Sequence, residues 1–89
     1  MYTLKIHKKA VKFFKSRSIS ERGFIKIKLD FLAENPYSHP QLDIKKLKGN
    51  EDVFRLRIGK IRIIYQIKND DLIILVFSAG ARGDVYKKL

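Results

Sequence analysis

The sequence predicts an α+β protein with the element order β-α-α-β-β-β, in which a helical hairpin packs on one face of a small, mainly antiparallel sheet. Two observations carry this prediction. Apolar residues recur at helical spacing early in the chain, whereas the second half alternates apolar and charged residues as strands do. The 89 residues contain no repeat, linker or low-complexity stretch, so we expect a single domain over residues 1–89.

The N-terminal part predicts a strand and two helices. Residues 2–6 alternate weakly, as in a short strand, and residues 7–17 carry apolar side chains at helical spacing among lysines. Ser20 is a good N-cap for a second helix, which we expect to run to about Glu34 because Asn35-Pro36 disfavours helix. Only a few residues separate the helices, so they should form an antiparallel hairpin. The second helix has a broad apolar face, made by Phe24, Ile25, Ile27, Leu29, Phe31 and Leu32.

The stretch from Val53 to Tyr65, V-F-R-L-R-I-G-K-I-R-I-I-Y, predicts a β-hairpin with one apolar face and one arginine face. Gly59-Lys60 fits a two-residue turn, because glycine supplies the positive φ that a type II′ turn needs first. Like charges placed opposite each other destabilise paired strands, so an opposed arginine pair suggests that an anion binds there. The turn fixes the expected pairs as Ile58 with Ile61, Arg57 with Arg62, Leu56 with Ile63 and Phe54 with Tyr65.

The remaining segments complete the sheet. Leu42 to Lys48 fits either a turn of helix or an extended segment. Leu72 to Ser78 is apolar on both faces, as in a strand covered on both sides. A two-residue turn at Asn69-Asp70 would pair Arg62 with Phe77 and Ile63 with Val76. The helices would then cover the apolar face, and the open face would carry Arg55, Arg57 and Arg62 over a floor of Ile64, Leu75 and Phe77.

The charge balance indicates a polyanionic partner. Twenty Lys and Arg residues against nine Asp and Glu give a net charge of +11, which favours RNA, DNA, a ribosome surface or an acidic protein. There is no cysteine, signal-peptide core or membrane-length apolar run, and we expect a cytoplasmic protein without membrane contact. His7 and His39 are far apart, and no carboxylate pair or glycine-rich phosphate loop occurs, so we expect neither a metal nor a cofactor.

The chemistry that these residues can perform is phosphate chemistry. Arginine presents forked donors that hold a phosphate bidentately, and several arginines around one phosphodiester could stabilise the charge that develops during cleavage. RNA supplies its own 2′-OH as nucleophile, so cleavage needs neither a metal nor a protein nucleophile. Arg55, Arg57 and Arg62 are the arginines that the hairpin gathers on one face.

The motif L-K-G-N-x-x-V-F-R-L-R-I-G-K-I-R-I-I-Y, followed by an apolar strand and G-A-R-G-D-V-Y-K, resembles the RelE branch of the RelE/ParE toxin superfamily. The resemblance covers nearly the whole chain. It implies the RelE-like fold and a type II toxin that enters the ribosomal A site and cuts mRNA by 2′-OH attack, giving a 2′,3′-cyclic phosphate. It also implies inhibition by an acidic, RelB-like antitoxin in a hetero-oligomer.

The resemblance assigns roles to five residues. It implies phosphate stabilisation by Arg57, Arg62 and Arg82, and base stacking or orientation together with help to the 2′-OH by Tyr86. Arg55 and Arg57 stand where the bacterial motif has two lysines. Arginine does not deprotonate in proteins, so a general base at Arg55 is not expected. Either these positions act by charge alone, or the lysines expected near the RNA take the proton: Lys46, Lys48 and Lys60.

Two other functions compete with an mRNA endonuclease. A ParE-like toxin would inhibit DNA gyrase and cut nothing, and the loss of both lysines favours it. A basic RNA-binding module without toxicity is the third reading, although the chain lacks the paired aromatic platform of common single-strand RNA binders. The retention of Arg62, Arg82 and Tyr86 favours the endonuclease.

Overall fold

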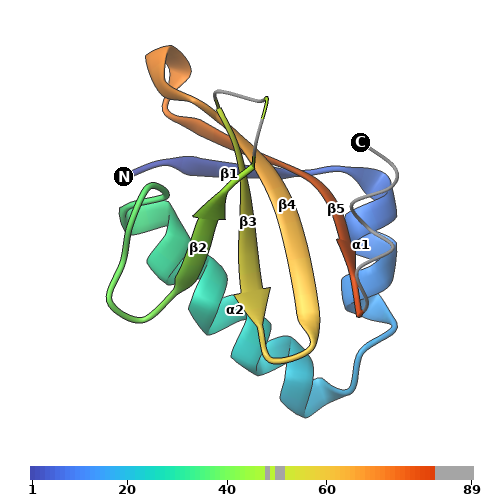
Figure 1. Cartoon of the computed structure of the whole chain (residues 1–89). Helices are drawn as coiled ribbons and strands as arrows, with labels where there is room; N and C mark the ends of the chain where they lie inside the picture. Colours follow the sequence, from blue (N-terminus) through green and yellow to red (C-terminus); the bar gives the residue numbers. More distant parts are fainter. Residues whose placement is uncertain (48, 50–51, 82–89) are drawn as a thin grey trace.

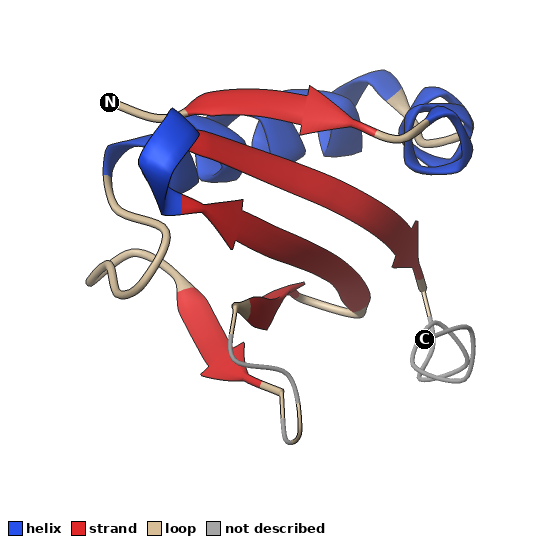
Figure 2. Cartoon of the chain, turned by 90° about the horizontal axis from the view of Figure 1, so that it is seen from above, coloured by secondary structure: helices blue, strands red, loops and turns tan. Residues whose placement is uncertain are grey.

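One mixed sheet with two helices on one side forms the molecule (Figures 1 and 2). The computed structural model describes residues 1–47, 49 and 52–81. The strand order is β1-β5-β4-β3-β2, and all neighbours are antiparallel except β1 and β5. The elements are β1 (Thr3–Ile6), α1 (Lys8–Lys15), α2 (Ile19–Glu34), β2 (Asp43–Lys46), β3 (Val53–Ile58), β4 (Ile61–Lys68), a 3-10 turn (Asn69–Asp71) and β5 (Ile73–Gly80).

This architecture confirms the predicted α+β class and decides the segment that the sequence left open. Residues 43–46 are extended and pair with β3 as an edge strand, so the sheet gains β2. In the described part of the chain, no helix is long and apolar enough to cross a membrane.

The chain turns back between the helices, but they do not lie side by side as an antiparallel hairpin would: α1 is seen end-on in Figure 2, whereas α2 runs across the view. α1 lies against β5, whereas α2 crosses behind β2, β3 and β4. His7 caps α1, because its Nδ1 accepts a hydrogen bond from the backbone N–H of Lys9 over 3.1 Å. This contact gives His7 a structural role.

The predicted N-cap of α2 was wrong by two residues. Ser18, not Ser20, caps the helix, and its Oγ accepts a hydrogen bond from the backbone N–H of Glu21 over 3.1 Å. Ser18 and Glu21 have the spacing of a capping box, in which serine at the cap satisfies the third free N–H of the helix. The predicted end at Glu34 is confirmed.

The hairpin register is confirmed at all four predicted pairs. Ile58 pairs with Ile61 and Arg57 with Arg62, and Gly59 has φ +58° at the first turn position. Positive φ is unstrained for glycine, which explains the residue type at this turn. The paired strands therefore present the expected two faces.

The register between β4 and β5 differs from the prediction. Asn69–Asp71 form a 3-10 turn and Leu72 adopts a left-handed conformation, so Lys68 pairs with Ile73 instead of Asp71. A β-bulge between Ile64 and Tyr65 then shifts the register again. As a result Arg62 pairs with Gly80 and Ile63 with Ala79, and the predicted partners Phe77 and Val76 were wrong.

The core lies between the helices and the apolar face of the sheet. Ile25, Leu29 and Leu32 of α2 pack there against strand residues such as Leu56 and Ile63. Each fully buried aliphatic side chain contributes about 1.5–3 kcal/mol to folding relative to an exposed one. This burial fixes which face of the hairpin is covered and leaves the arginine side turned away from the helices.

Candidate nucleic-acid interface

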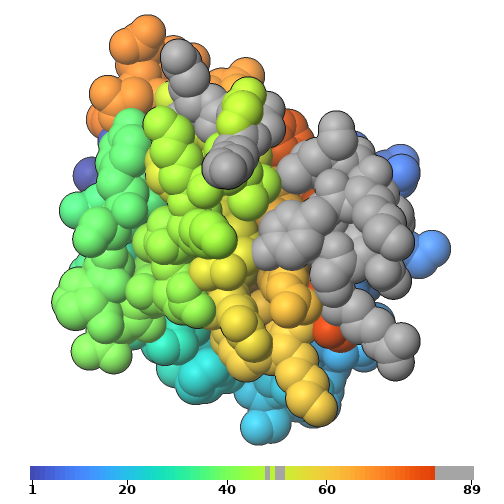
Figure 3. All heavy atoms as spheres, in the orientation of Figure 1, coloured from blue at the N-terminus to red at the C-terminus, as the bar shows by residue number. Residues whose placement is uncertain are grey.

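The sheet face turned away from the helices carries the predicted arginines. The strand register places its residues together, and we call this surface the arginine face: Asp43, Lys45, Arg55, Arg57, Arg62, Ile64, Ser78 and Gly80. Figure 3 looks onto this side of the molecule, where β2, β3 and β4, coloured green to yellow, lie across the middle.

Arg57 and Arg62 form the opposed pair at the centre of this face. They are directly across from each other, with Arg57 exposed and Arg62 half-buried. Arg57 Nε donates a hydrogen bond to the Gly59 carbonyl over 3.3 Å. Among the described residues, no carboxylate forms an ion pair with either guanidinium. The pair therefore has donors available for an anion such as a phosphate.

Arg55 lies on the same face but is already engaged. Its Nη2 is 2.7 Å from Oδ1 of Asp43, and its side chain is 14% exposed. Asp43 stands across from Arg57 in the register, yet its carboxylate reaches diagonally to Arg55. This partly buried ion pair holds the Arg55 guanidinium in place and neutralises part of its charge.

The lysines of β2 separate onto opposite sides of the sheet. Lys45 stands directly across from Arg55 and so belongs to the arginine face, whereas Lys46 stands across from Phe54 on the helix side. Lys60 lies in the β3–β4 turn. Sequence reasoning missed Lys45, although Asp43 and Lys45 alternate with apolar neighbours in the way that a strand would predict.

The floor of the arginine face differs from the one expected. Ile64 is fully buried there, opposite Ser78, and the bulge removes Phe77 from a regular pairing position. Ser78 Oγ is buried and has no hydrogen-bond partner among the described residues. The direct partner of Arg62 on β5 is Gly80, which has no side chain to cover the Arg62 guanidinium.

Three predicted site residues, Lys48, Arg82 and Tyr86, lie outside the described residues. The structure brings Arg55, Arg57 and Arg62 together on one face. In the described ranges, no three His, Asp or Glu side chains gather as a metal site would require. The guanidinium and ammonium groups of this face can stabilise negative charge.

Comparison with known proteins agrees with this architecture. A sequence model of the ParE toxins of type II toxin–antitoxin systems (parDE) matches residues 4–86. A curated relative from Methanocaldococcus jannaschii, provisionally named toxin RelE1, is 36% identical over 86 residues, which cover 97% of this chain and 96% of the relative.

Two solved structures are similar along almost the whole chain. The archaeal RelE–RelB complex from Pyrococcus horikoshii contains a chain that is 31% identical, with a TM-score of 0.80 over 92% of this chain and 96% of that one. The isolated Escherichia coli RelE toxin is 25% identical, with a TM-score of 0.77 over 99% of this chain and 94% of that one. Fold, sequence model and relatives agree, and the chain belongs to the RelE/ParE superfamily of type II toxins.

Proposed function

We propose that this toxin is a ribosome-dependent mRNA endonuclease that cuts codons in the A site and so inhibits translation. The observation that carries the proposal is the opposed pair of Arg57 and Arg62 on the face away from the helices. Two guanidinium groups across one strand pair are costly unless an anion lies between them. A phosphodiester of mRNA is the anion that fits a basic chain of net charge +11.

In the proposed reaction, the 2′-OH of the substrate attacks the adjacent phosphorus. The bond to the 5′ oxygen of the next nucleotide breaks, leaving a 2′,3′-cyclic phosphate and a 5′-OH. Arg57 and Arg62 stabilise the added negative charge on the phosphoryl oxygens, a kind of contribution worth about 10²–10³ in rate per donor. Arg82 joins them in this role, and Tyr86 stacks on or orients the base and helps the 2′-OH.

Arg55 has a different role in this proposal. Its ion pair with Asp43 holds the guanidinium in place beside the site, and arginine takes no proton. Lys45 lies directly across from Arg55, and we assign it as the base that takes the proton of the 2′-OH. Lys60 at the turn contacts the RNA backbone.

The partners follow from the same proposal. The Pyrococcus horikoshii relative was solved as a RelE–RelB complex, which supports an antitoxin partner for this chain as well. We propose that this toxin forms a hetero-oligomer with an acidic RelB-like antitoxin. The targets of the toxin are the ribosome and mRNA in the cytoplasm. An acidic antitoxin complements the positive charge of the toxin.

The test is a cell-free translation reaction with purified protein, in which mRNA 5′ ends are mapped by primer extension. We expect cuts within the A-site codon, and none when the same mRNA is incubated without ribosomes. Intact mRNA in a translating extract would contradict the proposal.

Gyrase inhibition is the second candidate function. The match to a model of ParE toxins and the arginines at positions 55 and 57 favour it. A supercoiling assay with purified gyrase separates the two, because an endonuclease leaves supercoiling unchanged. Inhibited supercoiling together with intact mRNA would assign the chain to this second function.

A further inference from the structure

An acidic residue, Asp43, belongs to the arginine face, although phosphate is the ligand proposed for that face. Its carboxylate Oδ1 is 2.7 Å from Nη2 of Arg55. In the strand register, however, Asp43 stands directly across from Arg57, and Arg57 stands across from Arg62. The negative charge therefore lies beside the two guanidinium groups that hold the phosphate in the proposed reaction, but it pairs with the third one.

The turn before β2 holds the backbone of Asp43 in place. The backbone N–H of Leu42 donates a hydrogen bond to the His39 carbonyl over 3.0 Å, and that of Gln41 donates to His39 Nδ1 over 3.1 Å. The Gln41 carbonyl accepts a hydrogen bond from Nζ of Lys28, a residue of α2, over 2.8 Å. The turn is thus tied to α2, and the carboxylate of Asp43 extends from a fixed point at the start of β2.

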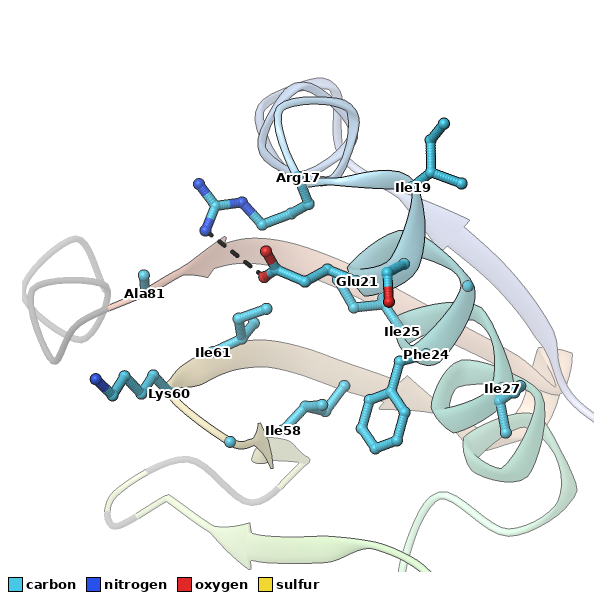
Figure 4. Close-up of a pocket in the computed structure, with 13 residues that line it drawn as sticks. Arg17, Ile19, Glu21, Phe24, Ile25, Ile27, Ile58, Lys60, Ile61 and Ala81 are labelled. Atoms are coloured by element: carbon cyan, nitrogen blue, oxygen red, sulfur yellow. Dashed lines mark ion pairs between the residues drawn. The ribbon is translucent and has the colours of Figure 1, made fainter.

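Two ion pairs at α2 differ from this one in place and in exposure. Arg17 and Glu21, 3.9 Å apart, are joined by a dashed line in Figure 4, where they line a mainly apolar pocket between α2 and the β3–β4 turn. Lys26 and Asp30 are 3.2 Å apart, and both side chains are largely exposed. Exposed pairs of this kind contribute little to stability. The pair on the arginine face instead joins two strands, and its guanidinium side chain is only 14% exposed.

Without the carboxylate, Arg55 would offer a second place for a phosphate. It lies two residues from Arg57 on the same strand and face, about 7 Å away along the strand. A guanidinium without a carboxylate partner has its forked donors available for a phosphate. A phosphate bound at Arg55 would take the place beside Lys45 that the 2′-OH needs in the proposed reaction. RNA bound in this way would not be cut.

We propose that Asp43 is a specificity-determining residue, whose carboxylate occupies Arg55 and repels a phosphate there, and so confines the scissile phosphate to Arg57 and Arg62. Interfaces gain specificity from groups that penalise the wrong arrangement as well as from groups that favour the right one. An ionised carboxylate accepts hydrogen bonds and donates none, so it binds a guanidinium and rejects a phosphate. The inference rests on the proposed function, because it concerns how mRNA is placed on this face.

The test measures single-turnover A-site cleavage by Asp43→Asn and by the wild type over a range of toxin concentrations. Asparagine keeps the shape of the side chain and removes its charge, which weakens the hold on Arg55. Binding of RNA in the wrong place adds affinity but no cleavage. The maximal rate and the half-saturating toxin concentration should therefore fall together, each by about three- to tenfold, and their ratio should stay within about twofold of the wild-type ratio.

Three further variants control this measurement. Asp30→Asn removes an equal charge from an ion pair of α2, and we expect both constants to stay within about twofold of the wild type. Asp43→Glu keeps the carboxylate and should restore both constants to within about threefold. Asp43→Asn/Arg55→Gln removes one charge of each sign together with the competing guanidinium, so its half-saturating concentration should return to within about threefold of the wild type. Circular dichroism of each variant checks that the fold is kept.

The outcomes separate this inference from the proposed function. Unchanged constants in Asp43→Asn, or a slower maximal rate without a lower half-saturating concentration, would overturn the role of Asp43 and leave the endonuclease standing. A double variant that keeps the lowered half-saturating concentration would overturn it as well.

A wild-type protein that cuts no mRNA would remove the proposed function, and binding of a short single-stranded RNA, followed by fluorescence anisotropy, then tests Asp43 by itself. Asp43→Asn should bind this RNA at least about threefold more tightly than Asp30→Asn does. Equal affinity of the two variants would overturn the inference.

Discussion

Three arginines on one face of the sheet have three different environments. Arg55 is paired with Asp43, Arg57 bonds to the Gly59 carbonyl, and Arg62 is half-buried opposite Gly80. A guanidinium held by a carboxylate has fewer donors left for a phosphate than one that is free. We therefore place the direct phosphate contacts at Arg57 and Arg62, with Arg55 as their charged neighbour.

Tyr65 closes the R-I-I-Y motif, and its role in the described structure is structural. It is fully buried, and its hydroxyl donates a hydrogen bond to the Pro36 carbonyl over 2.7 Å. This bond ties the segment after α2 to the centre of the sheet. Tyr65→Phe leaves that carbonyl unpaired, so we expect the free energy of unfolding at pH 7 to fall by about 1–2 kcal/mol in urea titrations. An unchanged midpoint would contradict this.

Burial also raises the pKa of the Tyr65 hydroxyl well above its usual value near 10. Because the folded-state pKa lies above the unfolded one, the contribution to stability is complete below about pH 10 and is lost as pH rises beyond it. The stability difference between wild type and Tyr65→Phe should therefore shrink between about pH 10 and 11. A difference that stays constant across this range would show that Tyr65 ionises as freely in the folded state as in the unfolded one.

At the scale of elements, the β4–β5 connection depends on an unusual backbone conformation. Leu72 has φ +53°, where a side chain normally costs about 1 kcal/mol or more. β-branched residues are strained most in this region, so Leu72→Val should lower the free energy of unfolding by about 1–2 kcal/mol, whereas Leu72→Gly should be tolerated. Chemical denaturation of both variants checks this, and equal stability of the two would refute it.

The edge strand β2 offers two adjacent lysines as an internal control. Lys45 faces the arginine side and Lys46 the helix side, and both are exposed. We expect Lys45→Ala to reduce A-site cleavage by about 10²-fold, as for loss of a proton-transfer group, and Lys46→Ala to have little effect. Primer extension measures A-site cleavage by each of the two variants. A larger loss of cleavage in Lys46→Ala than in Lys45→Ala would contradict the assignment of Lys45 as the base.

Sequence reasoning succeeded where the determinants are local. The β3–β4 register follows from one two-residue turn, and the end of α2 follows from Asn35-Pro36. The β4–β5 register was not accessible in this way, because a left-handed leucine and a bulge set it. Neither the left-handed conformation nor the bulge can be predicted from the types of the residues involved.

The candidate site could likewise be predicted only where it depends on local sequence pattern. Alternation along the hairpin located Arg55, Arg57 and Arg62 on one face. The Asp43 ion pair and the position of Lys45 depend on the register of β2, whose conformation the sequence left open. The exposure of Phe24 depends on how α2 rotates against the sheet, which tertiary packing decides.

At the scale of the whole molecule, the fold provides two surfaces on opposite sides of one sheet. The arginine face has guanidinium groups that suit a phosphate backbone, and the opposite face is covered by α1 and α2. The net charge of +11 attracts anionic partners, so the rates of association with mRNA and with an acidic antitoxin should both fall as the salt concentration rises.

The central claim is that the arginine face cleaves mRNA on the ribosome, and the rate of A-site cleavage by Arg62→Ala tests it most directly. Arg22→Ala is the matched control, because it removes the same charge from the exposed surface of α2. In single-turnover reactions on translating ribosomes, we predict that Arg62→Ala cuts at least about 10²-fold more slowly than the wild type, and that Arg22→Ala cuts within about threefold of it. Cleavage by folded Arg62→Ala at the wild-type rate would contradict the account.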